Sequence, residues 1–410
     1  MKLLIITLAI VLFALSSHKP IAPRQVSDAT RTGAVPRLTT DAGGNPLLTW
    51  VEKESDQKAT FYFARSADGG KTFGEKIQVN APATLSAHAE GMPKIAVKSD
   101  GTLLAVFEVP RPVAESRFAG DLLYVISKDE GKTWSEPKAV HQDTTPGKSH
   151  SFSDVTRMPN GEIGIVWLDE KLPGKEGRPV LFTQTNPSGG FGATVMVDDN
   201  ACQCCRTNVF VDAKQNIHLT YRDLLSGSEE KADQRPASRD ISHVVSADGG
   251  KTFSKPSAVF TDNWQVNACP HAGPSVTQVG NDVLVSWFSG KENAVGLRLA
   301  KVGSNQLVST VLSNRAKHPQ VTAVDGRLVW VWDEAVRKPG QAADEVMPQY
   351  VQRIAFRNSL TGPTSFLTPD DVSASYPAVL PTKNGFILAY EQVKDGQNPV
   401  ITVQYVDDVK

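Results

Sequence analysis

The sequence predicts an all-β fold built from repeated four-stranded units, and three observations support this prediction. A phrase of the form Ser-x-Asp-x-Gly-x-Thr-aromatic occurs three times, at residues 66–73, 127–134 and 246–253. A second pattern, two apolar runs joined by a turn that contains Gly or Asn, occurs seven times. No stretch has a long helical periodicity. Repeats separated by tens of residues indicate stacked or radial units, so the sequence predicts a single β-propeller.

The seven hairpins each end on an apolar strand that closes with an aromatic residue. Asn-Gly and Asp-Gly turns between apolar runs are strong hairpin signals, and the spacing suits one blade per hairpin, so we favour seven blades. The last strand candidate, residues 400–406, has no partner after it. We expect residues 25–30 to supply the missing outer strand and to close the ring. The closing aromatic residues are Trp50, Phe107, Trp167, Tyr221, Trp287, Trp332 and Tyr390.

The eight-residue phrase is expected to close a hairpin between the two outer strands of a blade. Asp and Ser side chains can bond the amides of a tight turn, Gly suits a left-handed backbone, and the aromatic residue packs beneath the turn. A weaker copy stands at residues 185–191, and the last three blades lack the phrase. The residues assigned to these turns are Ser66, Asp68, Gly70, Thr72, Ser127, Asp129, Gly131, Thr133, Ser246, Asp248, Gly250 and Thr252.

This phrase resembles the Asp-box, also called the BNR repeat, of sialidase-like β-propellers. The resemblance implies one propeller domain over residues 22–410, with six blades as the alternative because sialidases have six. Antiparallel strand order would put the Asp-box turns on one face and the connections between second and third strands on the opposite face. Long loops on one face of a rigid scaffold usually carry function. Those loops are expected at residues 110–120, 170–178, 224–240 and 335–349.

Charge and the N-terminal region bear on partners and location. The chain of 410 residues has 43 Lys and Arg against 44 Asp and Glu, a balance that argues against nucleic acid or an anionic membrane as a general partner. Residues 1–17 combine Lys2, a short apolar run and small residues, as in a secretory signal peptide, with an uncleaved anchor as the alternative. We therefore expect an exported, periplasmic or secreted monomer without a membrane span in the mature chain.

Cysteine and histidine residues gather before the first strand of five consecutive blades. Each lies about 14 to 19 residues ahead of its closing aromatic residue, so the topology predicts that they meet at the mouth of the central channel. Thiolate and imidazole suit copper or zinc. Structural disulfides and redox chemistry at the vicinal thiols are the alternatives. The set is His88, His150, Cys202, Cys204, Cys205, Cys269, His271 and His318.

Acidic residues follow six of the seven closing aromatic residues, and we expect them to ring the same face further out. Solvation and turn chemistry at a strand end would explain them as well. Asp154 and Asp223 are candidates to complete a metal site or to act as paired glycosidase carboxylates. The strand-end acids are Glu52, Glu108, Asp169, Asp223, Asp333 and Glu391.

The leading hypothesis is an exported sialidase-like propeller that binds copper or zinc at its channel mouth, with Arg206 shaping the pocket. The resemblance implies a glycoside hydrolase of the sialidase class as an alternative, which would need three arginines and a Tyr-Glu pair. The nearest match to the first arginine phrase is Val35-Pro36-Arg37-Leu38, and the adjacent Tyr390 and Glu391 would point to opposite faces of a strand. A propeller that binds a glycan, a small molecule or a protein without catalysis is the third possibility.

Overall fold

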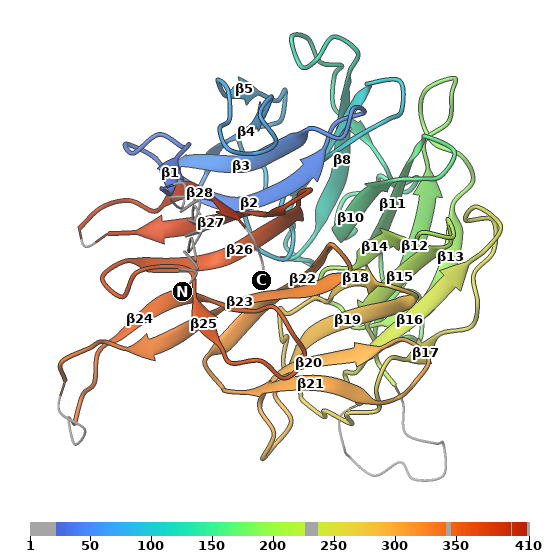
Figure 1. Ribbon diagram of the computed structural model, residues 1–410. Coiled ribbons are helices and arrows are strands. Elements are labelled where there is room, and N and C mark those ends of the chain that lie inside the picture. The colour runs from blue at the N-terminus through green and yellow to red at the C-terminus, as the bar shows by residue number, and fades with distance from the viewer. Residues whose placement is uncertain (1–21, 226–236, 342–345, 395, 408–410) are drawn as a thin grey trace, which may run out of the picture.

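The computed structural model describes residues 22–225, 237–341, 346–394 and 396–407. Within these ranges, 28 strands form seven antiparallel four-stranded sheets that follow one another around a ring (Figure 1). The predicted seven-bladed all-β propeller is therefore confirmed, and the six-bladed alternative is wrong. No helix in the described ranges is long and apolar enough to cross a membrane. The expected signal peptide, residues 1–17, lies outside the described residues.

The first two strands of each blade form its inner hairpin. The first strands contact one another around a closed ring and border the central channel. They are β2 (Thr32–Thr40), β6 (Lys94–Val97), β10 (Ser151–Arg157), β14 (Asn208–Val211), β18 (Ser275–Val279), β22 (Ala316–Val324) and β26 (Ser373–Pro381). The second strands are β3 (Pro46–Ser55), β7 (Leu103–Pro110), β11 (Ile163–Leu168), β15 (Ile217–Arg222), β19 (Asp282–Ser289), β23 (Arg327–Arg337) and β27 (Gly385–Val393).

The third and fourth strands form the outer half of each blade. The third strands are β4 (Lys58–Arg65), β8 (Gly120–Ser127), β12 (Arg178–Gln184), β16 (Ile241–Ser246), β20 (Gly296–Lys301), β24 (Tyr350–Arg357) and β28 (Val400–Asp407). The outermost strands are β5 (Ile77–Gln78), β9 (Lys138–Ala139), β13 (Val195–Ala201), β17 (Ser257–Ala258), β21 (Leu307–Leu312), β25 (Ser365–Phe366) and β1 (Arg24–Gln25).

The core lies between adjacent blades, because both faces of each second strand pack against a neighbour. Every residue of β11 and of β15 is buried; β11 is a continuous apolar run, whereas β15 also buries His218, Thr220 and Arg222. Each of the seven closing aromatic residues is at most 1 % exposed. These side chains fill the wedges between blades, so the same sequence pattern that marks a blade also joins it to the next one.

The N-terminal segment closes the ring as predicted, but its strand is Arg24–Gln25 rather than residues 25–30. Strand β1 pairs with β28, with Arg24 opposite Val403 and Gln25 opposite Thr402. Figure 1 shows this junction as the blue start of the chain lying beside its red end. One blade is therefore assembled from both ends of the chain, which ties the first and last described segments into the same sheet.

The Asp-box turns make the interactions expected of them. In the second copy, Ser127 Oγ accepts a hydrogen bond from Gly131 N at 2.8 Å, and Asp129 accepts bonds from Thr133 N at 2.9 Å and Thr133 Oγ1 at 2.6 Å. Gly131 has φ +93°, and a Cβ atom there would lie 2.5 Å from Phe63 Cζ of the preceding blade. This position therefore requires glycine both for the turn and for contact between blades.

Candidate functional site

The cysteines lie in two neighbouring connections that lead from one blade into the next. The first connection, residues 202–207, runs from β13 to β14, and the second runs from β17 to β18 through Cys269 and His271. Cys202, Cys204 and Cys205 are at most 5 % exposed, whereas Cys269 and His271 are exposed. The site therefore has a buried half and an accessible half.

The sulfur and ring-nitrogen atoms of these residues form two groups of three. In each group, all three atoms lie within 4.8 Å of one another. The first group is the Sγ atoms of Cys202, Cys204 and Cys205, and the second combines Cys204 with Cys269 and His271. Cys202 Sγ and Cys204 Sγ are 4.0 Å apart. No disulfide joins the four cysteines, which all lie in the described part of the chain and are free thiols.

Hydrogen bonds from outside the group surround the buried sulfur atoms. Arg239 Nη1 donates to Cys202 Sγ at 2.9 Å, and the backbone N–H of Ala272 donates to Cys205 Sγ at 3.5 Å. Hydrogen bonds from the Cys204 and Cys205 thiols, followed by the charge of Arg239, lower the pKa of Cys202. Burial raises the pKa of Cys205 to about 12. The free cluster thus favours one thiolate, on Cys202, with neighbouring thiols as its donors.

The structure brings some of the other predicted histidines to this place and keeps others apart. The rings of His88 and His271 meet edge to face, with centroids 5.0 Å apart. His150 does not reach the cysteines: its Nδ1 pairs with Asp169 Oδ2 at 3.0 Å, and its ring stacks on His141 at 3.6 Å. His318 belongs to neither group and pairs through Nδ1 with Asp333 Oδ2 at 2.7 Å.

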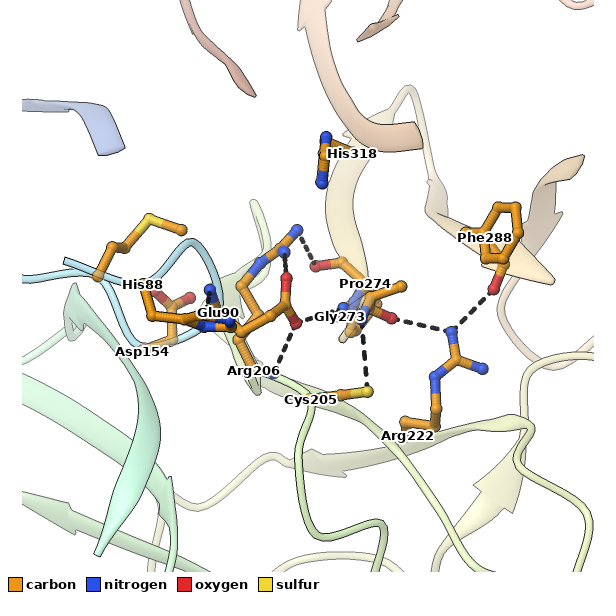
Figure 2. A network of polar contacts seen from close by, with 12 residues as sticks. His88, Glu90, Asp154, Cys205, Arg206, Arg222, Gly273, Pro274, Phe288 and His318 are labelled. Atoms are coloured by element: carbon orange, nitrogen blue, oxygen red, sulfur yellow. Dashed lines mark hydrogen bonds and ion pairs between the residues drawn. The ribbon is translucent and has the colours of Figure 1, made fainter. Parts of the chain in front are cut away.

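Glu90 ties the two cysteine-bearing connections together (Figure 2). Its Oε2 accepts the backbone N–H groups of Arg206 and Gly273 at 2.9 and 2.7 Å, and its Oε1 pairs with Arg206 Nη1 at 2.5 Å. Arg206 directly follows Cys205, and Gly273 lies one residue beyond Ala272, whose amide bonds Cys205. Glu90 comes from the segment before β6 and so reaches these loops from another blade. It is 1 % exposed.

We call the contacts of Glu90 with Arg206 and Gly273 the Glu90 clamp. Beside this clamp, a small pocket opens at the channel mouth. Its lining includes Arg37, Glu90, Arg206, His318 and Tyr376. The pocket has a volume of about 20 Å³, which is room for about one water molecule. Burial, followed by the charges of Glu391 and Asp333, raises the pKa of Tyr376. Arg206 also lines this pocket, and its charge is paired with Glu90.

The two predicted carboxylates lie at different places. Asp154 lines a larger polar cavity of about 160 Å³ inside the channel, where it faces Arg37 Nη2 at 3.5 Å and accepts the Val209 N–H at 3.1 Å. Asp223 lies at the end of β15, where it accepts Ser242 Oγ at 2.6 Å. Burial, followed by Asp198, raises the pKa of Asp223 to about 7. Asp223 lines neither the mouth pocket nor the inner cavity, so the two do not form a facing pair.

Three residues near the site, Glu90, Arg239 and Tyr376, were not identified from the sequence. Glu90 precedes a first strand rather than following a second strand, so it stood outside the acidic series. Arg239 and Tyr376 carry no local signal, since only the fold places them beside Cys202 and the channel mouth. A further set shares a left-handed backbone at the channel end of the first strands, with φ between +47° and +58°: Val35, Phe152, His271, His318 and Tyr376. Non-glycine residues in this conformation concentrate at functional sites.

Comparison with known proteins supports the fold and family. The sequence model described as BNR repeat-like domain matches residues 52–387. The intramolecular trans-sialidase from Ruminococcus gnavus has a TM-score of 0.54 at 10 % identity, over 94 % of this chain and 96 % of that chain. The leech intramolecular trans-sialidase has a TM-score of 0.53 at 10 % identity, over 96 % and 70 %. A protein of unknown function from Dyadobacter fermentans has 0.51 at 13 % identity, over 95 % and 99 %. No curated protein sequence matches the chain.

Proposed function

The chain belongs to the family of BNR repeat-like domains, and from that premise we propose that this sialidase-like propeller binds a transition-metal ion, copper or zinc, beside its channel mouth. The observation that carries the proposal is the convergence of four sulfur atoms and one imidazole from two interblade connections. All the cysteines of the chain take part. The candidate ligands are Cys202, Cys204, Cys205, Cys269 and His271.

The spacing of the sulfur atoms suits a metal ion. Two thiolates bound to one tetrahedral zinc at about 2.3 Å lie about 3.8 Å apart. The distance between Cys202 Sγ and Cys204 Sγ is 4.0 Å, so little movement would be required. Thiolate sulfur selects copper(I) and zinc over hard cations such as magnesium and calcium. The exposed Cys269 and His271 supply an entry path from solvent.

Donors around the cluster support the same reading. Arg239 and the Ala272 amide aim N–H groups at two of the sulfur atoms, as outer partners of metal-bound thiolates commonly do. Glu90 fixes the distance between the two connections, so the ligands are held before a metal arrives. Such preorganisation lowers the ordering cost of binding.

Metal analysis of protein purified under reducing, oxygen-free conditions tests the proposal. We expect at least one equivalent of copper or zinc per chain, and none in a variant with all four cysteines replaced by serine whose circular dichroism matches the parent. Less than an equivalent of any transition metal, together with oxidised thiols in protein from the native host, would contradict the proposal and support structural disulfides instead.

A glycoside-acting site at the channel mouth is a second candidate, favoured by the lining of the pocket. Arg37 can hold a carboxylate, and Tyr376 lies beside Glu391, whose pKa burial raises to about 7. Two structural neighbours are named as trans-sialidases. A pocket of about 20 Å³ is too small to take in a sugar ring, so this function requires the sugar to bind above the pocket or the lining residues to move. For this reason metal binding remains the first proposal.

Fluorogenic sialosides and neutral glycosides separate the two candidates. Hydrolysis that survives a strong chelator and disappears in Tyr376→Phe would support the glycosidase. Hydrolysis that persists in a variant lacking the four cysteines would show that the enzyme activity does not depend on the metal site. If neither metal binding nor hydrolysis is detected, a propeller that binds a partner without catalysis is the remaining candidate.

Export is a further proposal, based on residues 1–17, and fusion of this segment to a reporter active only outside the cytoplasm tests it.

A further inference from the structure

The five proposed ligands do not surround a single point. The three buried sulfur atoms form one group, and Cys204, Cys269 and His271 form the other, with Cys204 the only member of both. Two ligands of one ion, each about 2.3 Å from it, can be at most about 4.6 Å apart even in a linear arrangement. Because the five atoms do not form one group within 4.8 Å, a single ion cannot contact all of them in this arrangement.

We propose that the site holds two copper(I) ions bridged by the Cys204 thiolate, an inference that rests on the proposed metal-binding function. The inner ion would be bound by Cys202, Cys204 and Cys205. The outer ion would be bound by Cys204, Cys269 and His271, with the His88 ring adjacent to His271. A thiolate has more than one lone pair and can bind two soft cations at once, which explains why one sulfur atom is common to both groups.

The ligand number of each group favours copper(I) over zinc. Zinc in a structural site takes four ligands in a tetrahedron, whereas each group here supplies three. The inner group is closed to solvent, with Cys202 at 0 %, Cys205 at 1 % and Cys204 at 5 % exposure, so water is poorly placed to act as a fourth ligand. Thiolate-rich sites of low coordination number suit the soft monovalent ion.

Charge near the cluster is consistent with this assignment. Four thiolates and two monovalent ions leave a net negative charge, and buried charge requires partners. Arg239 bonds Cys202 Sγ directly, and the positive charge of Arg222 also acts on Cys205. Figure 2 shows Arg222 held in place by the carbonyl of Phe288, at 2.8 Å. Binding of each ion displaces thiol protons to solvent and changes no oxidation state, provided that copper is supplied as copper(I).

Titration with copper(I) buffered by bicinchoninate, under nitrogen and after reduction of the thiols, tests the proposal by stoichiometry. We expect two ions per parent chain. Cys205→Ser should lose only the inner ion and His271→Asn only the outer ion, leaving one in each case. Cys204→Ser should lose both as tight sites. His218→Gln, a histidine bonded to His243 and Asp212 away from the cluster, is the control and should retain two.

X-ray absorption provides the second measurement and keeps the test independent of the stability of any variant. A copper–copper distance short enough for a shared thiolate is expected in the parent. One ion per parent chain, two ions with no copper–copper scattering, or a Cys204→Ser variant that keeps one tight ion would each overturn the bridge while leaving metal binding intact. No copper bound at all would overturn the copper assignment, and absence of zinc binding as well would overturn the proposed function.

Discussion

At the scale of single residues, the Glu90 carboxylate links the two connections that carry the cysteines. One buried side chain accepts two backbone N–H groups and a guanidinium from two different blades. Burial raises the pKa of Glu90, but Arg206 and the two amides together lower it further, so the net pKa lies below the ordinary value. Gly273 is required by this arrangement, because a Cβ atom there would lie 2.2 Å from Arg206 Cγ. The clamp therefore depends on charge and on close packing together.

Replacing Glu90 by glutamine tests the clamp. The variant leaves Arg206 buried without its counter-charge, and we expect the free energy of unfolding to fall by about 3 kcal/mol in denaturant titrations at pH 7. Because the folded pKa of Glu90 is depressed, its contribution is present above the ordinary pKa and is lost as the pH falls through the folded value. The difference between parent and variant should therefore shrink in acid.

A matched substitution at an exposed glutamate controls for the loss of one negative charge. Glu115→Gln, on the β7–β8 connection, should change stability by less than about 0.5 kcal/mol. Equal effects of the two substitutions would show that Glu90 acts only through net charge, contrary to the contacts described. Weaker metal binding in Glu90→Gln than in Glu115→Gln would further tie the clamp to the cysteine connections.

At the scale of elements, the acids that end the second strands cross-link neighbouring blades. Glu391 accepts the Val35 N–H at 2.8 Å, and Asp333 accepts the Tyr376 N–H at 2.8 Å. Val35 and Tyr376 both have left-handed backbones at irregularities of the first strands. The carboxylates thus satisfy amides that the bulged strands leave without ladder partners. The acidic series read from the sequence is real, and for these members its role is structural.

The Asp-box turns show how an exposed carboxylate can carry a large pKa shift. Hydrogen bonds from the hydroxyl and backbone N–H of Thr133 lower the pKa of Asp129 to about 2. The Thr252 hydroxyl and amide likewise lower the pKa of Asp248. Each turn joins a third strand to an outer strand, so the charge stabilises the edge of a blade rather than its core. Its contribution must depend on pH.

Asp129→Asn should reduce the melting temperature at pH 7 by about 1 to 3 °C. The folded pKa is below the ordinary value of 3.8, so the parent's advantage is present above pH 3.8 and disappears as the pH falls toward about 2. Thermal melts followed by circular dichroism across this range measure the convergence. Asp56→Asn, in the exposed β3–β4 turn, is the control, and a pH-independent difference for Asp129→Asn would contradict this account.

At the scale of the whole molecule, stability depends on closing the ring. The β1–β28 pairing is supported by Ser27 Oγ, which accepts the Ile401 N–H at 2.8 Å, and by Gly33 N, which donates to the Pro399 carbonyl at 2.7 Å. These contacts join residues at opposite ends of the chain. Because the inner strands touch in a closed ring, loss of this junction would expose the cores of the first and last blades.

Gly33→Ala tests the closure. A Cβ atom at Gly33 would lie 2.8 Å from Ser27 Oγ and 3.0 Å from Ile401 N, so we expect a loss of about 1 to 3 kcal/mol in denaturant unfolding, with faster proteolysis near the N-terminus. Gly43→Ala is the matched control, since its Cβ would meet only the side chains of Asp41 and Asn45. Equal stability of the two variants would mean that the junction contributes little.

The sequence by itself determined the architecture, because its signals are local and repeat. Asn-Gly and Asp-Gly turns, aromatic strand ends such as Trp167, and three Asp-boxes each act within a few residues and are therefore readable one blade at a time. The seven hairpins predicted seven blades. The last of these lacked an outer strand after β28, and the start of the chain was the expected source of that strand. The gathering of cysteines at one blade position was readable for the same reason.

Only the tertiary structure decided which of the cysteines and histidines share a site. Residues at the same topological position of different blades can point their side chains in different directions. His150 turns toward Asp169 and His141, His318 turns toward Asp333, and Cys204 alone lies between the buried and exposed groups. Glu90, Arg239 and Tyr376 reach the site from segments far away in the chain, and no local pattern records such an approach. Side-chain direction and the packing of neighbouring blades supply what the repeat leaves open.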